Sequence, residues 1–137
     1  MNYISLMQFD TLPGLTVTVD SIAYDPTRPA PPDRPHPFVY HLSIHNSSPD
    51  TVRIFGRKWI VRDSDGDTMV VEGDGVVGQF PNLSPGETFS YTSGCPLTTP
   101  SGTMEGTYAM VTAAGETFNA AIPAFSLDSP FAKRVMH

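Results

Sequence analysis

Residues 51–73 read TVRIFGRKWIVRDSDGDTMVVEG, and this stretch decides the fold class. Two runs rich in β-branched residues flank the dipeptide Asp65-Gly66. An Asp-Gly pair between two such runs is one of the strongest sequence signals for a tight β-hairpin, because both residues tolerate the positive φ that the turn requires. The stretch therefore predicts a strand over 51–63, a turn over 64–67 and a second strand that begins at residue 68.

Apolar and polar residues also alternate on both sides of this hairpin. Residues 15–24 place Leu15, Val17 and Val19 on one face, and the parity changes afterwards, which predicts a β-bulge near Asp20–Ser21. Residues 38–46 place Phe38, Tyr40, Leu42 and Ile44 on the inward face. Further strands are expected at 88–94, at 103–112 with a hairpin into 117–122, and along the edge at 123–127.

About seven strands without an amphipathic helix are typical of an all-β fold, an immunoglobulin- or fibronectin-III-like β-sandwich of two antiparallel sheets. The chain has 137 residues, enough for a single core. We expect the domain over 13–128, with tails at 1–12 and 129–137. Six prolines make residues 25–37 a loop; a stiff connection is the preferred interpretation, and a ligand for an aromatic-lined groove is the alternative.

The composition argues against several functional classes. The net charge of −6 and the lack of a basic run argue against nucleic-acid binding. The N-terminal segment has no positively charged leader and no apolar run approaches a membrane span, so neither secretion nor membrane insertion is expected. Cys95 is the single cysteine and cannot form an intrachain disulfide, which favours a cytoplasmic protein.

Residues 73–78, GDGVVG, match the G-x-G-x-x-G spacing of dinucleotide-binding loops. Pro81 and Pro85 forbid the helix that must follow such a loop, so the dinucleotide interpretation fails. Two alternatives remain. Gly73, Asp74, Gly75, Val76, Val77 and Gly78 form an anion-binding nest of backbone N–H groups, or the glycines only shape a turn.

Three apolar residues beside these glycines, Val76, Val77 and Phe80, are candidates for an interaction surface. A rigid loop bounded by glycine and proline is a good support for protein docking. The alternative is that the same three side chains close one end of the sandwich.

No catalytic residues, metal ligands or cofactor are predicted. His41 and His45 share a strand face but lie roughly 13 Å apart, too far to hold one ion. Cys95 is expected in a turn as a small packed residue, without a neighbour that activates it. Asp63, Asp65 and Asp67 are expected to form the hairpin turn, since the spacing of a calcium loop is missing.

From Trp59 to Leu127 the chain resembles the ApaG family (DUF525). The resemblance is carried by GDGVVGQFPNLSPGETFSYTSGCPLTTPSGTMEGTYAM at 73–110 and by FNAAIPAFSL at 118–127. It implies a fibronectin-III-like sandwich, no established enzymatic activity, and a family linked to cobalt and magnesium sensitivity. Two departures stand out: the proline loop is richer than usual, and Lys58 replaces a histidine found in many members.

The combined expectation is a non-catalytic binding module. Its partner would be a protein of unknown identity, and the chain itself a monomer or homodimer. The alternative is a small-anion or nucleotide binder, for pyrophosphate or a dinucleoside polyphosphate, that acts through GDGVVG.

Overall fold

The computed structural model describes residues 11–130, which form strands and loops without any helix. The strands are β1 (Leu15–Tyr24), β2 (His36–Asn46), β3 (Val52–Asp63), β4 (Thr68–Asp74), β5 (Asn82–Leu83), β6 (Thr88–Leu97), β7 (Ser101–Thr112) and β8 (Thr117–Asp128). The all-β prediction is confirmed. The eighth strand is the short β5, which is not among the strands predicted from the sequence. Within the described residues there is accordingly no helix able to cross a membrane.

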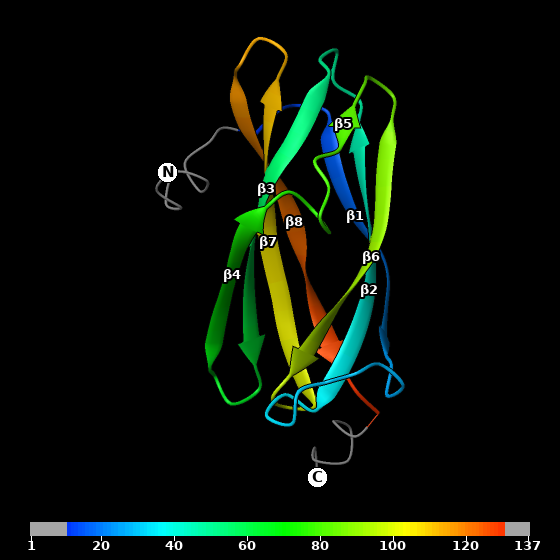
Figure 1. Cartoon of the computed structure of the whole chain (residues 1–137), viewed down its shortest axis with the longest axis vertical. Coiled ribbons are helices and arrows are strands. Elements are labelled where there is room, and N and C mark those ends of the chain that lie inside the picture. Colours follow the sequence, from blue (N-terminus) through cyan, green and yellow to red (C-terminus); the bar gives the residue numbers. More distant parts are fainter. Residues whose placement is uncertain (1–10, 131–137) are drawn as a thin grey trace.

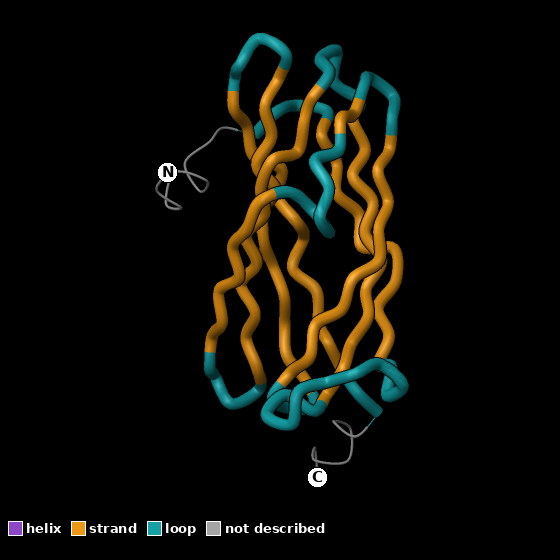
Figure 2. Tube along the Cα trace, viewed as in Figure 1, coloured by secondary structure: helices purple, strands orange, loops and turns teal. Residues whose placement is uncertain are grey.

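Two antiparallel sheets face each other as a sandwich (Figure 1). One sheet has the strand order β1-β2-β6, and the other has the order β4-β3-β7-β8, with β5 paired to the start of β3. Most loops gather at the two ends of the long axis, whereas the connection from β4 to β5 lies in the middle of the molecule (Figure 2). The two-sheet prediction is therefore confirmed.

Apolar and polar side chains alternate along the strands, and the apolar ones form the core between the two sheets. The four inward residues predicted on β2, Phe38, Tyr40, Leu42 and Ile44, are all buried. The pairing of β1 with β2 shifts between Val19 and Ser21, where the change of parity predicted a bulge. Burial of this shared face is the main force that holds the sheets together.

The chain between β1 and β2 is shorter than predicted. His36 and Pro37 were assigned to the proline loop, but they begin β2 and pair with Leu97 and Pro96 of β6. A proline is tolerated at the start of a strand, where one missing N–H interrupts little of the ladder. The loop therefore spans 25–35.

β8 continues past Pro123 by means of a bulge. The pairing with β7 shifts between Met104 and Gly106, at the level of this proline. Beyond the bulge, Phe125 turns inward and meets Tyr40 and Trp59, with ring centroids 5.8 and 6.0 Å away. The strand predicted at 123–127 is therefore present and continues β8.

The two sides of the sandwich differ. On one side β1 packs against β8, and Thr11 forms a parallel bridge with Asn119. Leu12 and Ser129, which the sequence assigned to the tails, are buried, so the packed domain extends slightly beyond 13–128. On the other side β4 and β6 are edges, which pair with no further strand of the described segment. This open side carries the candidate sites.

Candidate functional site

The glycine loop, residues 73–80, leads from the end of β4 toward β5 and is anchored to β3 at both ends. The N–H of Gly75 donates to the carbonyl oxygen of Phe55 over 2.8 Å. After the loop, the N–H of Ile54 donates to the carbonyl oxygen of Pro81 over 2.9 Å. The intervening residues therefore project from a fixed base.

The tip of the glycine loop is a two-residue β-turn. Val76 and Gln79 exchange backbone hydrogen bonds of 2.8 and 2.9 Å. The central residues, Val77 and Gly78, have φ values of 45° and 77°. Two positive φ values match a type I′ turn, in which Asn-Gly is the favoured pair. Val77 is the only non-glycine residue with positive φ in the described part of the chain, and a β-branched residue there is a strained outlier.

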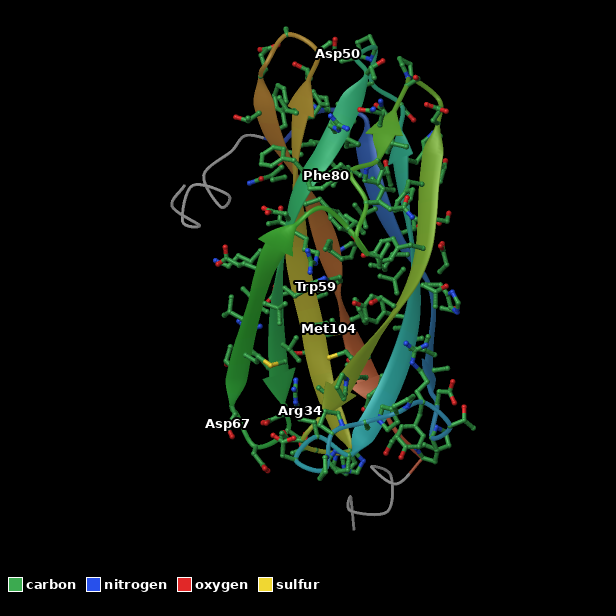
Figure 3. All side chains as sticks on the ribbon, viewed as in Figure 1. Arg34, Asp50, Trp59, Asp67, Phe80 and Met104 are labelled. Atoms are coloured by element: carbon green, nitrogen blue, oxygen red, sulfur yellow. The ribbon has the colours of Figure 1, made fainter. Side chains whose placement is uncertain are left out.

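The three apolar candidates of this loop separate into two roles. Val76 is 1% exposed and belongs to the core, so for this residue the alternative of internal packing holds, and its prediction as a surface residue is wrong. Val77 is 44% exposed and Phe80 is 47% exposed. Figure 3 shows Phe80 on the open side, along the chain that crosses between β4 and β5. One residue therefore anchors the loop and two face solvent.

The hydrogen bonds of the glycine loop orient its carbonyl oxygens toward a cation. Arg57 donates through Nη1 to the oxygen of Asp74 over 2.8 Å and to that of Gly75 over 3.3 Å. The N–H groups of Gly75 and Val76 donate to main-chain oxygens of the protein. A nest requires successive N–H groups that converge on an anion. These two donors already have protein acceptors.

The cations of β3 point to opposite faces, because successive side chains of a strand alternate between its two faces. Arg57 clamps the glycine loop on the inner side. On the outer side Lys58 forms an ion pair with Glu72 at 3.5 Å, and Arg62 forms one with Glu105. The binding of Arg57 to the carbonyl oxygens of the glycine loop was not predicted, because a contact between two strands has no local sequence signal.

His41 and His45 lie on the polar outer face of their sheet. Nδ1 of His41 is 2.5 Å from the hydroxyl of Thr92, and Nδ1 of His45 is 2.6 Å from that of Thr88. In each of these histidine–threonine pairs, the two residues lie directly opposite each other on β2 and β6. Within residues 11–130, no group of three His, Cys, Asp or Glu side chains is arranged to hold a metal ion.

Cys95 lies within β6, opposite Phe38, and the predicted turn position is therefore wrong. The strand continues through this residue because the neighbouring β2 begins earlier than expected. Cys95 is buried, and this burial raises the pKa of its thiol to about 11. At neutral pH the side chain is a protonated thiol that packs as a small apolar group.

Asp63 organises the hairpin between β3 and β4. Its carboxylate accepts hydrogen bonds from the Thr98 hydroxyl at 2.7 Å and from the N–H groups of Asp65 and Asp67 at 2.9 and 3.0 Å. The hydroxyl of Thr98, followed by these backbone donors, holds the pKa of Asp63 below its usual value. The predicted turn-forming role of Asp63 is confirmed.

Comparison with known proteins gives consistent matches. Residues 26–112 match the model of the ApaG domain family. Protein ApaG of Methylobacterium sp. (strain 4-46) is 52% identical over 124 residues, covering 90% of this chain and 95% of that protein. Protein ApaG of Beijerinckia indica is 55% identical over 100 residues, covering 73% and 77%. A solved structure from Bordetella pertussis is 44% identical with a TM-score of 0.76, covering 85% of this chain and 94% of that one.

Proposed function

The chain belongs to the ApaG family, and we propose that it is a non-catalytic protein-interaction module that binds its partner through Val77 and Phe80. The observation that carries the proposal is the strained conformation of an exposed β-branched residue. Val77 has a φ of 45° and is 44% exposed. Strain of this kind costs about 1–3 kcal/mol and is concentrated at functional sites.

Internal packing gives no reason for a valine at this position. Val76, one residue earlier, fills the core, and Asn or Gly would suit the turn better than Val77 does. The isopropyl group of Val77 is exposed, and so is the side chain of Phe80, three residues later in the same loop. An external contact accounts for both side chains.

The glycine loop is also pre-organised for binding. Both of its ends are tied to β3, its tip is closed by reciprocal hydrogen bonds, and Arg57 fixes two of its carbonyl oxygens. A surface that is already rigid loses little conformational entropy when a partner binds. The loop therefore presents its apolar groups at low entropic cost.

The surroundings indicate the chemistry of the partner. Arg53 approaches the carbonyl oxygen of Phe80 through Nε at 3.5 Å and is exposed. Among residues 11–130, no carboxylate forms an ion pair with Arg53. A protein with an apolar pocket and an acidic group at its rim would complement this surface.

The experiment places a photo-crosslinking amino acid at position 77 or, as a control, at position 22 in cells. Ile22 is a suitable control because it is 37% exposed on β1, in the other sheet. We expect a defined protein adduct from position 77 only, and its loss when Phe80→Asp is added. Equal adducts from both positions would contradict the proposal. Sedimentation of the adduct distinguishes a second copy of this chain from another protein.

Replacing Val77 by Asn separates docking from folding. The change should stabilise the protein by about 1 kcal/mol, because Asn tolerates the left-handed conformation at lower cost. It should also weaken partner binding, since the apolar contact is removed. A variant that is both less stable and fully competent in binding would refute the assignment.

The alternative, anion binding by the amides of the glycine loop, has its own test. An NMR titration with pyrophosphate and with diadenosine tetraphosphate would follow the backbone signals of Gly73, Gly75 and Gly78. Saturable shifts confined to these signals would favour the alternative. Because the N–H of Gly75 donates to Phe55, we expect that signal to stay in place.

A further inference from the structure

A cleft of about 260 Å³ lies between the two sheets on the open side of the sandwich. β4 supplies one wall through Met69 and Val71, and β6 supplies the other through its segment 93–96. Figure 3 shows Trp59 and Met104 at the centre of this region and Arg34 toward its lower end. The cleft lies apart from the exposed Val77 and Phe80, which are not among its lining residues.

Two arginines from distant parts of the chain line the cleft. Arg57 comes from β3, and Arg34 comes from the proline loop. The contact found for the Arg34 guanidinium is with the sulfur of Met69, 3.8 Å from Nη1, which is a weak and neutral acceptor. Arg57 uses only Nη1 on the glycine loop. Several strong donors therefore have no acceptor among residues 11–130.

Among the residues that the structure describes, no carboxylate lines this cleft, although the whole chain carries a net charge of −6. The ion pairs within the described residues join Lys58 to Glu72 and Arg62 to Glu105, both away from the cleft. Asp63 and Asp67 line an adjoining hollow together with Arg34. Neither carboxylate forms an ion pair with Arg34 within residues 11–130, and that of Asp63 is occupied by its own turn and by Thr98. The cleft is thus a locally positive hollow in an acidic protein, which attracts anions.

The remaining lining suits a flat apolar group. Tyr40 and Trp59 lie against each other, with ring centroids 5.5 Å apart, and line the cleft together with the adaptable thioethers of Met69 and Met104. Ligand pockets commonly combine such apolar walls with a few polar groups that fix orientation. The volume is close to the lower limit of ordinary ligand pockets, roughly 300 Å³, and therefore limits the ligand to about one ring.

We propose that this cleft binds a small organic anion, with its carboxylate or phosphate on Arg34 and Arg57 and its planar apolar body between the sheets. Guanidinium groups pair with either headgroup through charge-assisted hydrogen bonds. The site recruits the proline loop, because Arg34 reaches the cleft from that segment. The proposal is independent of docking through Val77 and Phe80.

Trp59 provides the measurement, because it is the single tryptophan of the chain and lines the cleft. Its indole N–H signal is followed by NMR during titration with phenyl phosphate, with benzoate and with neutral benzyl alcohol, at constant ionic strength. We expect a saturable shift with at least one of the two anions, and at least about tenfold weaker binding of the alcohol. The preferred anion identifies the headgroup class.

Two substitutions test the role of the arginine. Arg34→Gln should weaken anion binding at least about tenfold, because a charge-assisted contact is lost. Arg34→Lys keeps the charge but loses the planar fork of the guanidinium. Its affinity for the anion should therefore lie between those of the unmodified protein and Arg34→Gln. Arg53→Gln removes a positive charge outside the cleft and should leave the affinity within about twofold, since a screened distant charge contributes little. Thermal melting verifies that each variant is folded.

Three results would overturn the proposal. One is the absence of any saturable shift at roughly 10 mM of either anion, where even millimolar affinity is visible. Another is equal affinity for benzyl alcohol. The third is an Arg34→Gln variant that is folded and binds the anion as tightly as the unmodified protein does.

Discussion

Gly75 and Gly78 offer a matched pair of substitutions within one loop. Both have positive φ, 64° and 77°. A Cβ at Gly75 would collide with the carbonyl oxygen of Gln79, whereas a Cβ at Gly78 would meet no heavy atom of residues 11–130 within 4 Å. Alanine at either position therefore introduces the same backbone strain, and only alanine at 75 adds a clash with main chain.

The expected losses in free energy of unfolding follow from the backbone strain and the steric clash. Left-handed strain costs about 1–2 kcal/mol, which is the whole loss for Gly78→Ala. The clash adds about 1–3 kcal/mol, because the oxygen of Gln79 belongs to a hydrogen-bonded turn and cannot move freely. We therefore expect Gly75→Ala to lower the free energy of unfolding by about 3 kcal/mol.

Urea unfolding, followed by the fluorescence of Trp59, measures both losses under the same conditions. The slope with denaturant should be unchanged, since neither variant alters the surface exposed on unfolding. Equal losses for the two variants, within about 0.5 kcal/mol, would refute the reasoning, because the contact with Gln79 would then carry no energy.

The remaining predictions concern titratable groups. Asp63→Asn should destabilise the protein at neutral pH. Because folding lowers the pKa of Asp63 below 3.8, the difference in free energy of unfolding between the variant and the unmodified protein should shrink as the pH falls below that value. Urea unfolding at a series of pH values measures this difference. Cys95 should react with a thiol reagent only after denaturation, since it is buried with a raised pKa, and fast labelling of the folded protein would contradict this burial. The hydroxyls of Tyr91 and Tyr108 form a hydrogen bond with each other. Tyr108→Phe should lower the free energy of unfolding by about 1–2 kcal/mol, because the hydroxyl of Tyr91 loses its partner, and adding Tyr91→Phe should cause no further loss. Additive losses in the double-mutant cycle would contradict this hydrogen bond.

Local patterns were sufficient for most of the fold. The Asp65-Gly66 hairpin, the inward face of β2 and the bulge near Ser21 depend on neighbours in the sequence, so periodicity and turn chemistry predicted them. The errors occurred where pairing with a distant strand extended an element. His36 and Cys95 were expected in loops because prolines follow them, yet β2 and β6 pair through both segments.

The sequence by itself determined the fold class, the family resemblance, the position of the glycine loop and its apolar residues. Only the tertiary structure decided what those residues do. Val76 enters the core while Val77 remains exposed, and Arg57 crosses to the loop carbonyls while Arg34 arrives from a separate loop. The physical reason is that burial and charge pairing depend on which segments meet across the sandwich. Periodicity along one strand carries no information about which distant segments pack against it.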